Sequence, residues 1–465
     1  MKNLLFILLL PIALQAQKSK TDFNTYMQGQ ASQYGFNGNV LVAKAGHVIY
    51  ERSFGYSDYN TRKRLDDNSV FDCGSIAKEF TAVGILLLKD RGKLSLTDTL
   101  RKFFPQLPYH NITVKQLLTH TSGIPDGFEL VSKHFDHSKT ATNDDLIRLL
   151  AEEKPPALFP PGEGLRYSGT GFNLLASIIE KLSGQPYKIY MQERVFTPLA
   201  MFHTNVANGP RSPKEFAGYA YGYIYSDSLK KYERADTPNS DWTTYLSGIT
   251  GEGMIITTTD DLLKWDRALK DHRLLAAATQ IDMLAQHAEH PVFKIAFGYG
   301  IRAGKNDNGK YIFHNGAFPG YLSMHLRYIE DDITVIVLSN NGSRADFIAD
   351  ALAAIALKKD VAMPYQHKAI ASIVPSDAYK GKYAMPLTRP PYMARFPVEF
   401  IVKDQKLLIH PGNGSDIELL AESPTKFFFG DGSDQQIEFE VDKSNNHLKV
   451  WHTAWGVKNE LQPVN

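Results

Sequence analysis

The sequence predicts an α+β fold followed by a small all-β domain. Up to residue 357, apolar runs typical of strands are mixed with amphipathic helical segments, and a β-hairpin stands near the start. This mixture favours an antiparallel sheet flanked by helices, with a separate helical part. After Lys359 the helical pattern stops, and short alternating runs between Gly, Asn, Asp and Ser clusters predict a barrel or sandwich of about 90 residues.

The composition agrees with a globular protein built from more than one domain. The chain has 465 residues, of which 43% are hydrophobic and 22% are charged, so it can bury a sizeable core. The formal net charge of +1 provides no basic field for nucleic acid and no strong attraction to membranes. We therefore expect a small-molecule or peptide-like substrate as the partner, and the oligomeric state stays open.

The first 16 residues have the pattern of a secretory signal peptide. Lys2 precedes an apolar run that ends near Ala16 and is too short to span a bilayer comfortably. No later stretch is apolar enough to cross a membrane, so no span is expected once the peptide is removed. We expect a periplasmic or extracellular protein. An uncleaved anchor is the alternative, and the bulky Leu14 leaves the cleavage site open.

Hydrophobic periodicity and capping residues predict the elements of the first part. A hairpin is expected from strands at 38–44 and 47–51, with the turn Ala45-Gly46 between them. Asn143 and Thr259 are expected to cap the helices that begin there. Helices are expected at 75–89, 114–119, 143–152, 172–182, 260–269 and 345–357, and further strands at 297–301, 324–328 and 334–338.

The same patterns set the domain boundaries. We expect a signal peptide at 1–16, a main domain at 17–360, a linker at 361–376 and a C-terminal β-domain at 377–465. The function of the last domain is open between structural support, a lid, a partner surface and a substrate filter. Its strands are expected at 398–402, 407–410, 417–420, 426–429, 436–441 and 448–452.

Ser75 and Lys78 are the first candidates for catalysis. If the segment that they begin is a helix, the two side chains lie one turn apart on the same face. A serine hydroxyl needs a nearby base to act as a nucleophile, and a lysine amine can serve if it is neutral. Burial and the positive end of the helix dipole both lower the pKa of such a lysine. The same spacing also arises by chance, and Ser75 could be an ordinary N-cap.

Further segments accompany this pair in a fixed order. They are 55–56, 92–96, 117–126, 161–162, Tyr167-Ser168-Gly169, 182–184, 196–201, His314-Asn315-Gly316 and 319–321. In this order the chain resembles the serine β-lactamase and penicillin-binding superfamily, specifically its class C-like branch, which includes esterases and D-amino-acid peptidases. The resemblance runs from Phe36 to Leu357 and implies a β-lactamase/transpeptidase-like fold.

The resemblance implies a role for each matching residue. Ser75 would be the acylated nucleophile, Lys78 the base or proton relay, and Tyr167 would lie opposite with its phenol close to both. Which of the last two is the base is left open. The N–H groups of Ser75 and Ala317 would form an oxyanion hole, which stabilises the charge of the tetrahedral intermediate. No cofactor is expected.

Two motifs depart from the family pattern. His314-Asn315-Gly316 stands where β-lactamases commonly have Lys-Thr-Gly, which implies a substrate-binding edge strand along the cleft. Because His314 removes a permanent positive charge, we expect weaker binding of the carboxylate of penicillins and cephalosporins. Gly169 stands where the family often has an Asn that contacts the lysine and the substrate, and its loss favours an esterase or another relaxed acyl hydrolase. Asn173, one helical turn later, could partly substitute.

Other candidate residues are explained more simply by structure. His120 follows a helix in a turn and is expected to cap and pack. His134 and His137 resemble a metal pair, but no matching cluster accompanies them, so no metal site is expected. Glu252, between two glycines, is expected in a tight turn that borders the cleft. Cys73 is the single cysteine, which excludes an internal disulfide and a thiolate metal site.

These observations predict an exported serine hydrolase that works through an acyl-enzyme on Ser75. The substrate is expected to be a small ester, amide or D-amino-acid peptide. Two alternatives stay open. One is a true β-lactamase or D-Ala-D-Ala carboxypeptidase, and the other is a catalytically weak protein that binds a cell-wall ligand in the same cleft. Turnover separates them, because a binding protein acylates once and does not cycle.

Overall fold

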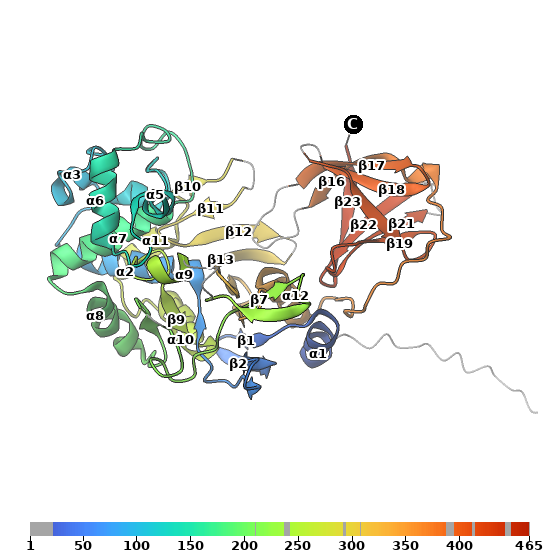
Figure 1. Ribbon diagram of the computed structural model, residues 1–465, viewed down its shortest axis with the longest axis horizontal. Helices are drawn as coiled ribbons and strands as arrows, with labels where there is room; N and C mark the ends of the chain where they lie inside the picture. The colour runs from blue at the N-terminus through green and yellow to red at the C-terminus, as the bar shows by residue number, and fades with distance from the viewer. Residues whose placement is uncertain are drawn as a thin grey trace, which may run out of the picture.

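The computed structural model describes residues 22–209, 211–236, 242–291, 294–306, 308–386, 395–411, 414–441 and 448–464. They form a large α+β part and, beyond it, a closed β-barrel (Figure 1). The predicted α+β fold class and the C-terminal all-β barrel are both confirmed. The predicted signal peptide at 1–16 lies outside the described residues, and the domain boundaries remain predictions. No helix in the described part of the chain is long and apolar enough to cross a membrane.

Among the described residues, an antiparallel sheet of eight strands forms the centre of the large part. The predicted hairpin is its pair β1–β2, and β1 also pairs with β15, from Gly38 opposite Ser339 to Lys44 opposite Ile333. In spatial order the strands are β10 (Ala288–Glu289), β11 (Ala296–Phe297), β12 (Arg302–Asn306), β13 (Gly309–Phe318), β14 (Tyr321–Tyr328), β15 (Ile333–Ser339), β1 (Gly38–Lys44) and β2 (His47–Phe54).

Helices cover both faces of this sheet. Side chains alternate between the two faces of a strand, so Val40 and Val42 of β1 belong to one core, whereas Leu41 and Ala43 belong to the other. The first core also receives α1 (Phe23–Tyr34) and α12 (Ala345–Ala356), and the second receives α2 (Ala77–Asp90) and α10 (Thr259–Lys270). Helix α2 is therefore buried along most of its length, and its first turn carries Lys78.

The helical part packs against α2. It contains α3 (Leu100–Phe103), α4 (Val114–Leu118), α5 (Gly127–His134), α6 (Asn143–Glu153), α7 (Gly169–Ser183), α8 (Tyr187–Met191), α9 (Trp242–Tyr245) and α11 (Ala277–Leu284). Two predicted N-caps are wrong by one residue, because Thr142 caps α6 and Thr258 caps α10. An N-cap needs extended backbone angles, which both threonines have, while Asn143 and Thr259 are already helical.

Short strands complete the large part. Strands β5 (Phe71–Asp72), β9 (Ile255–Thr257) and β6 (Asn205–Val206) form a small sheet, and β3 (Tyr56–Asp58) pairs with β4 (Lys63–Arg64) and β7 (Tyr223–Ser226) with β8 (Lys231–Arg234). The strand predicted at 297–301 is wrong beyond Phe297. The chain turns there at Gly300, whose φ of 67° is not compatible with a strand.

The described residues of the C-terminal region form a closed antiparallel barrel of eight strands. Its first and last strands close it, with Tyr383 opposite Pro463. The barrel contacts the large part through Trp455, between β22 and β23. The Trp455 ring stacks on Phe347 of α12 with the ring centroids 4.0 Å apart. The strands are β16 (Gly381–Pro386), β17 (Arg395–Lys403), β18 (Lys406–Pro411), β19 (Ile417–Ala421), β20 (Lys426–Phe429), β21 (Gln435–Val441), β22 (Leu448–Ala454) and β23 (Val457–Pro463).

Candidate active site

Ser75 lies in a tight turn that leads directly into α2. The turn is a single 3-10 segment, Gly74–Ile76, and the Gly74 N–H donates to Asp72 Oδ1 at 2.8 Å. Gly74 has a φ of 52°, and a Cβ there would lie 2.5 Å from the backbone nitrogen of Ala317. Glycine therefore permits both the left-handed backbone and the close approach of this turn to β13.

Strand β13 passes the turn that carries Ser75, and one edge of the strand is open there. Among the described strands, β12 pairs with residues 309–313 of β13 and leaves 314–318 without a partner on that side. The motif therefore lies on an interior strand of the sheet, which corrects the expectation of an edge strand, although its second half is open. A Cβ on Gly316 would overlap the Cys73 carbonyl oxygen, so glycine allows the strand to lie against the turn. The oxyanion hole of Ser75 and Ala317 remains a prediction.

Lys78 is buried and makes three hydrogen bonds. Its Nζ lies 3.1 Å from Ser75 Oγ, 2.8 Å from the Glu252 carbonyl oxygen and 2.8 Å from Glu252 Oε2. An ammonium group has three N–H donors and no acceptor, so these oxygens provide one acceptor for each donor, and the Tyr167 side chain also interacts with it. The sequence pair thus becomes a triplet of serine hydroxyl, ammonium and carboxylate.

The electrostatic surroundings keep Lys78 charged. Burial by itself would lower its pKa, but the Glu252 carboxylate and Tyr167 outweigh burial and raise the pKa of Lys78 above its ordinary value. The pKa of Lys78 is thus shifted in the direction opposite to the one expected from burial and the helix dipole. The physical reason is the carboxylate, whose contact with Lys78 depends on a loop far away in the sequence.

Tyr167 lies beside Lys78, with its ring centroid 4.9 Å from Nζ. The ring packs between His120, at 4.4 Å between centroids, and the Arg302 guanidinium, at 4.5 Å. His120 also accepts the N–H of Ser168 on Nδ1 at 3.1 Å, which fixes the chain next to Tyr167. His120 therefore packs as expected, and it also positions the tyrosine.

A cavity of about 800 Å³ opens beside Ser75. The residues that line it include Ser75, Tyr167, Arg302, Asn315 and Ala317. The structure thus brings two predicted catalytic residues to the cavity, together with Asn315 and Ala317 of the predicted binding and oxyanion positions. Its remaining lining residues are Leu158, Phe159, Leu165, Arg166, His290, Ile295 and Phe297.

Arg302 places a cation in this cavity that sequence reasoning missed. Its Nη1 donates to Asn315 Oδ1 at 2.8 Å, and its buried Nε has no hydrogen-bond partner among the described residues. The loss of a lysine at position 314 therefore does not leave the cavity without a permanent positive charge. The alternation of β12 and β13 side chains could have suggested this arginine, but only with the strand register known.

His314 lies below the cavity and not in its lining. Its side chain is buried, and its Nδ1 lies 2.8 Å from the carbonyl oxygen of Asn315. Burial, followed by Arg302 and Lys78, holds the pKa of His314 well below its usual range, so the ring is neutral at neutral pH. Among the residues predicted to bind substrate, Asn315 lines the cavity, whereas Gly169, His314 and Gly316 do not.

Glu252 occupies the space beside Gly169. A Cβ on Gly169 would lie 3.0 Å from Glu252 Oε2, so the carboxylate stands where a longer side chain would begin. Asn173 does not replace the missing amide, because its Nδ2 donates to the Thr250 carbonyl oxygen at 2.9 Å. Glu252 was expected only to border the cleft, and its contact with Lys78 is the main feature that sequence reasoning missed.

The small sheet of β5, β9 and β6 brings Glu252 close to Ser75 and Lys78. Strand β5 ends just before the Ser75 turn, and β9 begins just after the Glu252 loop. Asp72 pairs with Ile256, and the Cys73 N–H donates to the Ile255 carbonyl oxygen at 2.9 Å. This pairing places the two loops side by side, although their residues are far apart in the sequence.

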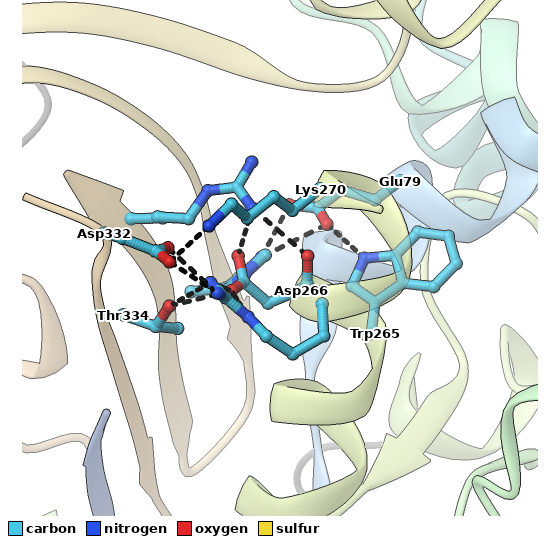
Figure 2. A network of polar contacts seen from close by, with 9 residues as sticks. Glu79, Trp265, Asp266, Lys270, Asp332 and Thr334 are labelled. Carbon is cyan, nitrogen blue, oxygen red and sulfur yellow. Dashed lines mark hydrogen bonds and ion pairs between the residues drawn. The ribbon is translucent and has the colours of Figure 1, made fainter. Parts of the chain in front are cut away.

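A buried polar network supports α2 behind the site (Figure 2). Glu79, which follows Lys78, accepts the Trp265 indole N–H at 2.6 Å, and His325 lies 3.2 Å from both Glu79 and Asp266. Burial would lower the pKa of His325, but these two carboxylates outweigh it and raise the pKa to about 9. The network continues through Arg267, Lys270, Arg327, Asp332 and Thr334.

The histidine pair at 134 and 137 has local structural contacts. The His137 ring stacks on Tyr245 with centroids 3.9 Å apart, and His134 lies 3.5 Å from Glu153. Within the described ranges, no group of three or more His, Cys, Asp or Glu side chains is arranged to hold a metal ion. Cys73 is buried and free.

Comparison with known proteins places this site in a family. The sequence model of the Beta-lactamase family matches residues 23–358. Penicillin-binding protein 4* of Bacillus subtilis strain 168 is 34% identical over 333 residues, which cover 71% of this chain and 74% of that protein. D-amino acid amidase from Ochrobactrum anthropi SV3, in complex with L-phenylalanine amide, has a TM-score of 0.58 at 25% identity, over 68% of this chain and 89% of that chain.

The likeness of fold extends over the barrel. The octameric penicillin-binding protein homologue from Pyrococcus abyssi has a TM-score of 0.65 at 23% identity and covers 94% of this chain and 98% of its own. An antiparallel sheet flanked by helices, with a serine and a lysine at the start of a buried helix, defines the class of β-lactamase-like serine hydrolases. The chain belongs to the Beta-lactamase family.

Proposed function

We propose that the protein is an exported acyl hydrolase that cleaves a small amide, ester or D-amino-acid peptide through an acyl-enzyme on Ser75. The observation that carries this proposal is the contact of 3.1 Å between Ser75 Oγ and Lys78 Nζ beside a cavity that Tyr167 also lines. The similarity to a D-amino acid amidase supports an amide or peptide as the substrate.

The reaction proceeds in two acyl-transfer steps. Ser75 Oγ attacks the substrate carbonyl carbon, its proton passes to a base, and the carbonyl oxygen becomes an oxyanion near the N–H groups of Ser75 and Ala317. The intermediate collapses, and the leaving amine or alcohol departs with a proton. Water then attacks the ester carbonyl carbon, and the acid leaves as Ser75 Oγ regains its proton.

Arg302 favours a second, narrower candidate function. Arg302 lines the cavity, and its guanidinium is suited to a carboxylate, which forms short charge-assisted hydrogen bonds with it. A D-alanyl-D-alanine terminus and a penicillin both carry such a group. D-Ala-D-Ala carboxypeptidase or β-lactamase activity therefore stays a candidate, in spite of the histidine at position 314.

Turnover of p-nitrophenyl acetate tests the general proposal. The purified protein is compared with Ser75→Ala and with Ser132→Ala, an exposed serine on α5 that serves as the control. We expect continuous release of p-nitrophenol by the wild type and by Ser132→Ala, and background rates with Ser75→Ala. A single burst without turnover would instead support a protein that binds a cell-wall ligand. D-phenylalanine amide, N-acetyl-D-alanyl-D-alanine and a penicillin then identify the substrate class.

Export is the second part of the proposal and is tested separately. The short apolar run between Lys2 and Ala16 supports it. Expression of the whole chain in a Gram-negative host, followed by mass determination of the protein in the periplasmic fraction, should show a chain shortened near residue 16. A full-length product confined to the cytoplasm would contradict export without affecting the proposed activity.

A further inference from the structure

Gly169 and Glu252 are neighbours in space. Because Gly169 has no side chain, the Glu252 carboxylate has room beside it. Oε2 of Glu252 would lie 3.0 Å from a Cβ at position 169 and lies 2.8 Å from Lys78 Nζ. A Cβ at position 169 would require the end of the Glu252 side chain to shift by a few tenths of an ångström, and a longer side chain would compete with the carboxylate for the space beside the lysine. The two residues lie on different elements, at the start of α7 and before β9.

The ion pair is well shielded from water. The side chain of Lys78 is 0% exposed and that of Glu252 is 17% exposed. Glu252 also contributes its backbone carbonyl oxygen, so one residue supplies two of the three acceptors of the ammonium group. The third acceptor is Ser75 Oγ. The orientation of Lys78 toward the nucleophile therefore depends on Glu252.

We propose that Glu252 is a positioning residue that holds Lys78 as an ammonium aimed at Ser75, and that it takes the place of the amide that Gly169 lacks. This inference rests on the proposed function, since it concerns the activation of Ser75. Its consequence is that Lys78 donates to Ser75 Oγ and does not remove its proton. Tyr167, which lines the cavity beside Lys78, is then the residue that accepts the Ser75 proton and later returns it to the leaving group.

The other groups that face Lys78 do not supply the negative charge that Glu252 provides. His120 and His314 are neutral near pH 7, because burial, Arg302 and Lys78 hold their pKa values well below the usual range. Arg302, on β12, is a cation. Removal of the Glu252 charge would therefore leave the burial of Lys78 opposed mainly by Tyr167, and the pKa of Lys78 would fall.

The first test is the pH dependence of kcat/KM in Glu252→Gln, which keeps the size of the side chain and removes its charge. We expect the basic limb of the profile to move to lower pH by about one to three units, because the ammonium form of Lys78 is lost earlier. Glu163→Gln, at an exposed position, is the control and should leave the profile unchanged. A basic limb that does not move in Glu252→Gln would overturn the proposal, and an acid limb that moved to lower pH while the basic limb stayed in place would identify neutral Lys78 as the base.

The second test removes the Glu252 carboxylate and places an amide side chain at position 169. Gly169→Asn and Glu252→Ala should each lower kcat/KM, on the order of tenfold or more, because each breaks the contact with Lys78. The double variant should recover at least part of the loss, since the amide then has room to accept from Lys78. Losses that multiply in the double variant would contradict an exchangeable pair. Thermal unfolding of each variant shows whether a loss reflects the site or the fold.

A readout independent of the substrate separates this inference from the proposed function. The rate of Ser75 modification by a fluorophosphonate, followed by mass spectrometry, is measured across pH for the wild type and Glu252→Gln. A shifted basic limb in this reaction would support the role of Glu252 even if no substrate in the panel were turned over. Equal profiles in the two proteins would overturn it even if the wild type were an active hydrolase.

Discussion

The charges around Ser75 come from residues that lie far apart in the sequence. Lys78 is kept as an ammonium by Glu252, which is 174 positions away, and the cation lost at position 314 is supplied by Arg302 on the neighbouring strand. The site is therefore more strongly charged than its motifs suggest. One carboxylate and one guanidinium define its electrostatics, and each makes a separate prediction about activity.

Arg302 should discriminate between substrates with and without a terminal carboxylate. In Arg302→Gln, the ratio of kcat/KM for N-acetyl-D-alanyl-D-alanine to that for its methyl ester should fall by about tenfold to a hundredfold, because hydrogen bonds to charged groups contribute about 1.5 to 3 kcal/mol. Measuring both substrates with each enzyme removes general effects on Tyr167, which Arg302 also contacts. The exposed Arg148→Gln is the control, and an unchanged ratio in Arg302→Gln would exclude carboxylate recognition by Arg302.

The candidate site could be predicted from the sequence only where its residues belong to local motifs. Ser75 and Lys78 share one helical turn, and Tyr167 belongs to a short segment that matches the family order. Glu252 and Arg302 could not be assigned, because their contacts depend on the pairing of β5 with β9 and of β12 with β13. Tertiary pairing of this kind leaves no periodic signal in the sequence.

Among the elements, β13 and the turn that carries Ser75 must approach each other closely for the site to form. We expect Gly316→Ala to lower turnover on the order of a hundredfold, because a Cβ there would overlap the Cys73 carbonyl oxygen and shift the strand. The rate of p-nitrophenyl acetate hydrolysis measures this effect. Gly209→Ala, where no atom lies within 4 Å of the added Cβ, is the control. Equal activity of both variants would show that the strand can move without loss.

Helices and hairpins were more predictable than the strands that close the barrel. The hairpin of β1 and β2 and helices α2, α4, α6, α7, α10 and α12 follow from periodicity, with shifts of a few residues at their ends. Strands β16 and β23 were not predicted. In β23, Leu461 is the buried residue among exposed and half-buried neighbours, so the strand lacks the apolar alternation that identifies the others.

At the scale of the whole molecule, buried histidines make stability depend on pH in two directions. His120 and His314 are held neutral in the folded protein. The free energy of unfolding therefore decreases as pH falls below about 6.5, because the same histidines bind protons in the unfolded chain. His325 is held protonated between Glu79 and Asp266. Its contribution is fully present below about pH 6.5 and is lost as pH rises through its folded pKa of about 9.

The free energy of unfolding should therefore decrease between pH 6.5 and 9 as His325 loses its preference for the folded state. One proton gives a slope of at most about 1.4 kcal/mol per pH unit. Urea denaturation at several pH values measures this slope, and it should be smaller in His325→Asn, which cannot titrate. That variant should also be less stable at pH 6, because it removes the cation that lies between the buried carboxylates of Glu79 and Asp266. The exposed His47→Gln is the control. Equal slopes for the wild type and His325→Asn would mean that His325 is not protonated between these carboxylates, and that Asp266 depends on Arg267 and Arg327 alone for its compensating charge.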